Sequence, residues 1–297
     1  MLVWHNVSRK KRILLSKFRR IIENSDFLAS SFRYIRDIFQ LYKKPKKSIY
    51  GFLWCGSESM RKGIFEKEEV DIFHSLLKHV DVFVNIGANQ GMYCCLALNQ
   101  KKSVIAVEAN PINFKYLMNN IFINNWQNNS KLYPIAAGSS SGIVKMYGGS
   151  TGSSIVSGWA GTSSRYSQLV PSVKLDELIL HQLDGKQCLI LADIEGYEKE
   201  MLLGSKLILK LNPKPIWIVE IIRKDHQPSG VEINPDLLDS FEIFWNLGYS
   251  SYTNEKNSRE IKREEVISIS QTGNDSLNTS NFIFIDKKLD MKSLINE

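Results

Sequence analysis

The fold of this chain follows from residues 82–91, which read VFVNIGANQG. The first five of these residues are apolar enough for a short buried strand, and a helix is predicted over 92–98. The turn between them contains Gly87 and Gly91. Glycine has no Cβ and tolerates positive φ, so such a turn lets a ligand approach the backbone. By itself the pattern is typical of a nucleotide-like cofactor site and also of a plain strand–helix turn.

Strands and helices alternate from residue 81 onward. Further strands are predicted over 103–108, 131–137, 188–193 and 216–222, and closing strands over 249–253 and 282–286. Further helices are predicted over 111–125, 197–206 and 235–247. This alternation indicates an α/β domain in which helices cover both faces of a parallel sheet.

Two segments interrupt the alternation. Residues 138–170 are rich in Gly and Ser, and so long an insertion between core strands is more often functional than idle. Its Trp159 and Tyr166 suit either stacking on a flat ligand or packing of the insertion itself. Residues 254–280 are polar, and we expect an exposed loop or hairpin there.

An acidic residue, Glu108, follows the second strand. Its carboxylate can accept both hydrogen bonds of a ribose diol, and its distance along the chain from Gly91 suits NAD or S-adenosylmethionine (SAM). A pyrophosphate site requires G-x-G-x-x-G, but Asn89 stands at the position of the second glycine. Since SAM has no phosphate, the glycine pattern favours SAM. An NAD-linked oxidoreductase remains the alternative enzyme.

Three motifs in order then resemble one family. Residues 85–91 read NIGANQG, residues 108–111 read EANP and residues 193–198 read DIEGYE. Together they resemble the FkbM family of SAM-dependent methyltransferases, as do Ala136 in the third-strand element and the Gly-Ser-Ser run at 152–154. The resemblance implies a class I methyltransferase fold, Rossmann-like, with a seven-stranded mostly parallel sheet whose last strand is antiparallel.

The resemblance also implies which residues bind SAM. The implied cofactor-binding residues are Asn85, Gly87, Ala88, Asn89, Gly91, Glu108, Asn110 and Ala136. Two of the motifs depart from the family pattern, because Asn85 stands where the family usually has Asp, and Ala192 where it usually has Lys. The insertion reads Ser-Ser-Ile-Val in place of S-S-L-E. These departures favour a second alternative, a methyltransferase-like protein that binds a partner without turnover.

Three carboxylates are candidates for catalysis: Asp193, Glu195 and Glu220. Each lies at or just beyond the end of a predicted strand, where open α/β sheets bind ligands. Methyl transfer to a hydroxyl requires a base for the hydroxyl proton, and a partly desolvated carboxylate can serve. The alternatives are helix capping for Asp193 or Glu195, and for Glu220 an ion pair with Arg223 or Lys224. We expect no metal, because no second and third ligand accompany Asp193.

The composition is that of an ordinary soluble protein with an unusual N-terminus. The chain has 297 residues, 43% hydrophobic and 23% charged, enough for one sizeable core with an extension. Residues 1–50 contain 13 Lys and Arg against three acidic residues, a net charge of +10, so the remainder carries −3 of the total +7. The basic character therefore belongs to the N-terminal arm, and we expect no nucleic-acid partner for the main domain.

The N-terminal arm combines basic residues with apolar residues at helical spacing. We expect a basic amphipathic helical arm over 1–50, a helical lead-in over 51–80 and the SAM-binding domain over 81–297. The arm either packs on the domain or attaches through residues 1–47 to an anionic membrane surface. Four cysteines without a disulfide or zinc spacing favour the cytoplasm, and attachment through the arm would place the protein at the inner membrane face.

The function predicted from the sequence is SAM-dependent O-methylation of a hydroxyl. The methyl transfer rests on the three motifs. The choice of a sugar or glycan as the acceptor rests on the resemblance and on the polar, aromatic-containing insertion.

Overall fold

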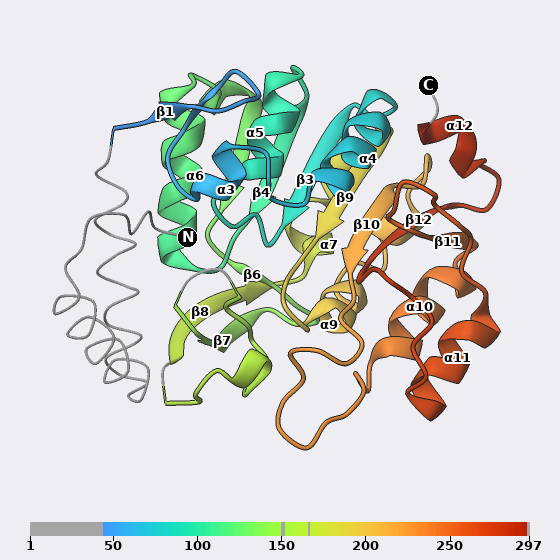
Figure 1. The fold of residues 1–297 in the computed structure, drawn as a ribbon. Coiled ribbons are helices and arrows are strands. Elements are labelled where there is room, and N and C mark those ends of the chain that lie inside the picture. Colours follow the sequence, from blue (N-terminus) through green and yellow to red (C-terminus); the bar gives the residue numbers. More distant parts are fainter. Residues whose placement is uncertain (1–43, 150–151, 166, 296–297) are drawn as a thin grey trace, which may run out of the picture.

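The computed structural model describes residues 44–149, 152–165 and 167–295. A seven-stranded sheet runs through the centre in the order β11-β12-β10-β9-β3-β4-β5 (Figure 1). Its strands are β3 (Val82–Ile86), β4 (Ser103–Val107), β5 (Ser130–Tyr133), β9 (Cys188–Ala192), β10 (Ile216–Glu220), β11 (Tyr249–Thr253) and β12 (Asn281–Asp286). The last strand, β12, is antiparallel to both of its neighbours, and the β5-β4-β3-β9-β10 pairs are parallel. The predicted α/β class and sheet are therefore confirmed.

The strand register brings the chemically important turns to one edge. Ile86 at the end of β3 pairs with Val107 at the end of β4 and with Ala192 at the end of β9. The next residue of each strand is Gly87, Glu108 or Asp193. These three residues therefore lie side by side at the carboxyl edge of the sheet. Parallel pairing alone places them together, although they are far apart in the sequence.

Helices cover both faces of the sheet (Figure 1). One face packs against α4 (Lys67–Lys78), α5 (Met92–Asn99), α6 (Pro111–Ile123) and α12 (Met291–Ile295). The other packs against α7 (Leu175–Leu178), α8 (Leu180–Leu183), α9 (Glu198–Leu203), α10 (Leu237–Asn246) and α11 (Arg263–Thr272). Both faces need cover because successive apolar side chains of a strand point to opposite faces. In β3, Phe83 points to the first helix layer, whereas Val82 and Val84 point to the second.

The predicted strand over 131–137 is wrong in one respect, because it is two strands. β5 ends at Tyr133, and β6 (Ala136–Ala137) belongs to a separate three-stranded sheet with β7 (Gly142–Tyr147) and β8 (Ser167–Val173). Pro134 lies between the two strands and has no N–H to continue the ladder of the main sheet. The insertion thus forms its own small sheet, β6-β8-β7, beside the main one (Figure 1).

The loop or hairpin predicted over 254–280 is also wrong, because α11 occupies 263–272. Glu264 and Glu265 lie in its first turn, Val266 and Ile269 are buried, and Gly273 ends it with a left-handed φ of 70°. A single buried stripe against α10 stabilises this otherwise polar helix. Three short 3-10 helices, η1 (Gln127–Asn129), η2 (Trp159–Gly161) and η3 (Ile208–Lys210), complete the loops.

The segment before the main sheet begins with a small hairpin. β1 (Lys46–Lys47) pairs with β2 (Leu53–Trp54), and the four-residue helix α3 (Glu58–Arg61) leads to α4. Most of the predicted arm lies outside the described residues. Among the described helices, none has the length and apolar character required to cross a membrane.

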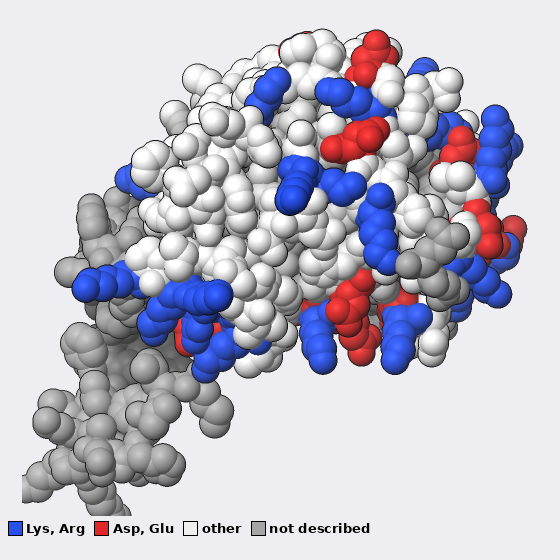
Figure 2. Space-filling view, turned by 90° about the horizontal axis from the view of Figure 1, so that it is seen from above, with Lys and Arg blue, Asp and Glu red and all other residues white. Residues whose placement is uncertain are grey.

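Charges are mixed over the face seen in Figure 2. Lys and Arg side chains alternate there with Asp and Glu, and on this face they do not gather into one continuous basic stripe. The four cysteines are buried, and none of them forms a disulfide bond.

Candidate functional site

The turn after β3 is shaped by contacts within the chain. Gly87 has φ +79°, and a Cβ on it would lie 1.8 Å from the carbonyl oxygen of Asp193. Gly91 has φ +88°, and its Cβ would lie 2.6 Å from the Leu117 side chain. Both positions therefore require glycine whether or not a ligand is bound. Gly87 thus lets the loops after β3 and β9 approach each other closely, and Gly91 lets the turn pack against α6.

Glu108 closes the same turn from the next strand. Its carboxylate is buried and accepts the backbone N–H of Asn89 at 2.7 Å and that of Asn110 at 2.6 Å. Burial raises the pKa of Glu108 to about 7, although these hydrogen bonds act in the opposite direction. A carboxylate offers about four lone-pair sites, so one remains for a hydroxyl beside these two N–H groups and the Asn113 side chain. Glu108 thus organises the turn and remains able to bind a diol.

A cleft of about 600 Å³, part of it open to solvent, lies beside this turn. Four of the predicted cofactor residues line it: Gly87, Asn89, Glu108 and Ala136. Its apolar walls come from the ends of the strands and from the insertion, namely Ile86, Val107, Ile135, Ala137, Met146 and Ile155.

The charges of the cleft distinguish between cofactors. Its described lining residues include Glu108, Asp193 and Glu195 but no Lys, Arg or His. A pyrophosphate would face three carboxylates there without a cationic partner. A nucleoside with a sulfonium carries a positive charge and a diol, and apolar walls suit its base. These residues therefore fit SAM and do not fit NAD.

Three other predicted cofactor residues do not line the cleft. Asn85 points to the layer of α5, where its Nδ2 lies 3.5 Å from Cys94 Sγ and its Oδ1 has no hydrogen-bond partner among the described residues. Ala88 is buried and donates its N–H to Val107. Gly91 is the left-handed residue that opens α5. The structure therefore places these three residues in the framework around the cleft.

Asn110 also lies behind the cleft. Its Oδ1 caps α6 by accepting the N–H of Ile112 at 2.9 Å and that of Asn113 at 3.3 Å. Its Nδ2 donates to Ser153 Oγ at 2.8 Å. Asn110 thus joins the motif after β4 to the Gly-Ser-Ser run of the insertion.

Asp193 and Glu220 form a pair of neighbouring carboxyl groups. Asp193 follows β9 and lines the cleft, while Glu220 ends β10 and is hydrogen-bonded to it. Burial raises the pKa of both, and the negative charge of Asp193 raises that of Glu220 further. Such a pair retains one proton that the two carboxyl groups share.

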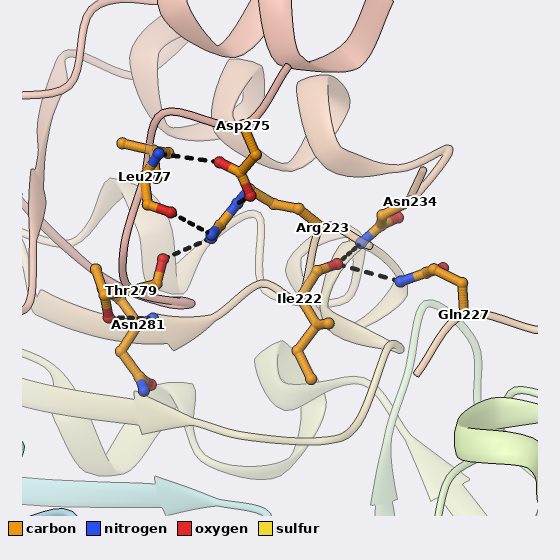
Figure 3. Close-up of polar contacts among 8 residues, drawn as sticks. All are labelled: Ile222, Arg223, Gln227, Asn234, Asp275, Leu277, Thr279 and Asn281. Atoms are coloured by element: carbon orange, nitrogen blue, oxygen red, sulfur yellow. Dashed lines mark hydrogen bonds and ion pairs between the residues drawn. The ribbon is translucent and has the colours of Figure 1, made fainter. Parts of the chain in front are cut away.

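Arg223 is not the partner of Glu220, so the alternative of an ion pair with it is excluded. Its guanidinium is buried and binds Asp275 at 2.5 Å and the carbonyl oxygens of Leu277 and Thr279 (Figure 3). The backbone leading into β12 is thereby anchored to the end of β10. Asn281, the first residue of β12, is placed next to this anchor (Figure 3).

Glu195 connects the loop after β9 to the insertion. It has a left-handed φ of 58°, its carbonyl oxygen accepts Ser154 Oγ at 2.5 Å, and its Oε2 accepts Trp159 Nε1 at 2.8 Å. The Trp159 ring is buried against Gly196, where a Cβ would lie 2.4 Å from it. Trp159 therefore packs the insertion, while Tyr166 lies outside the described residues. His226 Nδ1 lies 3.8 Å from Glu195 Oε2.

Sequence reasoning did not single out Glu198 or Asn113. Glu198 is buried and accepts the N–H of Gly196 at 3.0 Å, which holds the loop that carries Asp193 and Glu195. Burial raises the pKa of Glu198 to about 8. Asn113 lines the cleft and hydrogen-bonds Glu108. The last Glu of the DIEGYE motif was the available signal for Glu198, whereas Asn113 had none.

Comparison with known proteins gives one family. The model described as "Methyltransferase FkbM domain" matches residues 85–251, more than half of the chain. No curated protein matches the sequence.

Solved structures with a similar arrangement include methyltransferases. One is a methyltransferase FkbM from Methylobacillus flagellatus KT (TM-score 0.43, 15% identity), in a match covering 88% of this chain and 61% of that one. Another is a SAM-dependent methyltransferase from Agrobacterium tumefaciens (TM-score 0.43, 11% identity), in a match covering 82% of this chain and 70% of that one. A third is an O-methyltransferase from Bacillus cereus in complex with SAH (TM-score 0.38, 10% identity), in a match covering 73% of this chain and 79% of that one. The assignment rests on the family match, since these TM-scores are low.

Proposed function

Because this chain belongs to the FkbM methyltransferase family, we propose that it transfers a methyl group to a hydroxyl of a sugar or glycan. Its cofactor is SAM, and its acceptor is a small molecule. One observation carries the proposal: Asp193 lines the cleft that contains Glu108 and is hydrogen-bonded to Glu220, a second buried carboxyl group.

The cleft residues bind and orient the cofactor. Glu108 would accept the ribose hydroxyls, and the apolar wall around Ile135 and Ala136 would contact the base. Asn89 and Gly87 would lie against the remaining part of the molecule. When bound, SAM would supply a methyl group on a sulfonium, and in-line attack on the methyl carbon would break its bond to sulfur and release S-adenosylhomocysteine (SAH). The acidic lining stabilises that positive charge in a partly desolvated site.

Asp193 would remove the proton of the acceptor. A hydroxyl is a weak nucleophile, and as it forms its bond to the methyl carbon, its proton passes to the Asp193 carboxylate. Burial raises the pKa of Asp193 and makes it a stronger base than an exposed aspartate. Glu220, protonated, orients Asp193 through their hydrogen bond. Glu195 would border the acceptor at the open side of the cleft.

The sugar class of the acceptor rests on the resemblance and on the insertion. Ser153, Gly152 and Glu195 give that side of the cleft a polar surface suited to hydroxyls. We further propose that the protein acts in the cytoplasm, since none of its four cysteines forms a disulfide bond. We also propose that residues 1–47 contact an anionic membrane surface peripherally.

A turnover assay tests the proposal. The full chain is incubated with SAM and a panel of glycans, monosaccharides and phenols, and SAH release and the methylated product are measured by mass spectrometry. We expect SAH and an O-methyl glycan, and calorimetry should show tighter binding of SAM than of NAD. Tenfold tighter binding of NAD would reject the cofactor site. SAM binding without any turnover on cell glycan extracts would favour the non-catalytic alternative.

A further inference from the structure

A groove lies where α6 meets β5, at the far end of the main sheet from β11. Its volume is about 890 Å³, part of it open to solvent. Its described lining residues are Lys115, Met118, Asn119, Ile121, Phe122, Gln127, Ser130 and Leu132. None of them lines the cofactor cleft, so the groove is separate from the proposed methyl-transfer site.

The groove exposes apolar side chains beside an open sheet edge. Phe122 is 69% exposed and Met118 is 42% exposed, and their spacing of four residues places them on one face of α6. β5 pairs with β4 on one side, and no strand of the described residues pairs with its other side. Proteins usually cover such an edge, and an apolar patch next to it is typical of a contact surface.

The described part of the chain begins close to this groove. The Asn124 side chain, at the end of α6, accepts the N–H of Leu53 at 2.9 Å and donates to its carbonyl oxygen at 2.8 Å. Leu53 pairs with Lys47 in the β1-β2 hairpin, which lies beside α6 (Figure 1). Three residues of extended chain span at most about 11 Å, so Lys44 lies within that distance of Lys47. The 43 preceding residues are therefore attached next to the groove.

Part of this preceding segment has the sequence pattern of a packing helix. Residues 27–42 read FLASSFRYIRDIFQLY. Five of the apolar residues recur at alternating spacings of four and three: Leu28, Phe32, Ile35, Phe39 and Tyr42. On a helix they would share one face, and the three charged residues, Arg33, Arg36 and Asp37, would lie on the other. The net charge of only +1 distinguishes residues 27–42 from residues 9–20, which contain seven Lys and Arg and no acid.

We propose that residues 27–42 form a helix that packs its apolar face into the groove between α6 and β5. The contact would remove Phe122 and Met118 from water together with the apolar face of the segment. Covalent attachment next to the groove gives this segment a high effective concentration there, an advantage that a second copy of the chain lacks. The inference goes beyond the proposed function, and it leaves the basic residues 9–20 available for an anionic surface.

Hydrogen exchange measured by mass spectrometry on the full chain tests the docking. An isolated helix of this length is marginal in water, so slow exchange reports packing. In the wild type, amides of residues 27–42 should exchange at least about tenfold more slowly than those of residues 9–20. Phe122→Asp should abolish that difference, because it places a charge in the groove. Ile143→Asp is the matched control, since Ile143 is 74% exposed on β7, outside the groove.

Met118→Asp is a second groove variant, used if Phe122→Asp lowers the melting temperature by more than the control does. Equal exchange of residues 27–42 in the wild type and the groove variants would overturn the proposal. A dimer in analytical ultracentrifugation that Phe122→Asp dissociates would also overturn it, because the groove would then bind a second copy. Protection of residues 27–42 that appears only with anionic liposomes would overturn it by assigning this segment to the membrane.

Discussion

Single carboxylates in this protein have different roles because their surroundings differ. Glu108 accepts two backbone N–H groups and faces the cleft, whereas Glu198 is enclosed and holds a loop. Glu220 is next to the Asp193 carboxyl group, and burial together with that negative charge raises its pKa. The residue type alone would not separate these roles, since each depends on which donors and charges lie nearby.

Glu108→Ala should weaken SAM binding by about 1–3 kcal/mol, the effect of leaving the ribose hydroxyls without their acceptor. Calorimetry at constant salt measures it. Glu177→Ala is the control, because Glu177 is exposed and remote from the cleft. Unchanged SAM affinity with intact folding would show that Glu108 only organises the turn.

Asp193→Asn should lower kcat about 10²–10⁴-fold, the usual range for loss of a general base, with a smaller effect on SAM affinity. Asparagine keeps the shape and can still accept a hydrogen bond from Glu220, but it cannot take up a proton. The measurement is initial rate against acceptor concentration at saturating SAM. An Asn variant with wild-type kcat would remove Asp193 from the mechanism.

At the scale of elements, the insertion is attached to the domain by a few buried contacts. Trp159 packs on Gly196 and donates to Glu195, and Asn110 donates to Ser153. These contacts connect the small sheet to the loops after β4 and β9. The insertion thus forms one wall of the cofactor cleft.

Trp159→Ala should destabilise the packing of the insertion by about 3–5 kcal/mol, because the ring is buried. Limited proteolysis should then cut within 148–165 faster than in the wild type. Trp159→Phe is the matched variant, since it keeps an aromatic ring and loses only the hydrogen bond to Glu195. Equal protease resistance of the Ala variant and the wild type would contradict the packing role.

The N-terminal arm yields a separate prediction. Deleting residues 1–43 should abolish co-sedimentation with anionic liposomes and leave SAM affinity intact, because β1 and its pairing with β2 are retained. High salt should weaken the binding of the full chain through screening. If the full chain ignores anionic liposomes, or if the deletion unfolds the core, the arm is structural.

At the scale of the whole molecule, buried carboxylates affect stability. Burial raises the pKa of Glu66 and Glu108 to about 7 and that of Glu198 to about 8. These groups have lost their protons by pH 6.5 in the unfolded chain but hold part of them in the folded chain. The folded state therefore binds more protons, and the free energy of unfolding falls as pH rises.

We expect these three groups to lower the free energy of unfolding by about 2–4 kcal/mol between pH 6.5 and 8.5 without cofactor, and the proton retained by Asp193 and Glu220 to lower it further, as measured by urea unfolding. Burial lowers the pKa of His74, so its titration makes the free energy of unfolding rise with pH. Starting at pH 6.5 limits this opposing contribution. Glu198→Gln should flatten the dependence. A free energy of unfolding that rises over this interval would show that these groups are ionised in the folded protein.

Much of the architecture was predictable because it depends on local pattern. Apolar runs such as 82–86 and 188–192 identify buried strands, and glycine at 87 and an acid at 108 mark the turns after them. Two local predictions were wrong: Pro134 splits one predicted strand, and α11 lies in a predicted loop. The helix needs its packing on α10, which its polar sequence does not reveal.

The sequence by itself determined how the main strands and helices follow one another along the chain, which family the chain belongs to, and that Glu108 and Asp193 stand at strand ends. Only the tertiary structure decided that Asp193 meets Glu220, that Asn85 faces α5 and that Glu66 lines a cavity together with Asp193. The physical reason is that periodicity within a segment follows from neighbouring residues, whereas contacts across the sheet depend on strand order and register. Burial, which sets the pKa of these carboxylates, exists only once those strands and helices have packed.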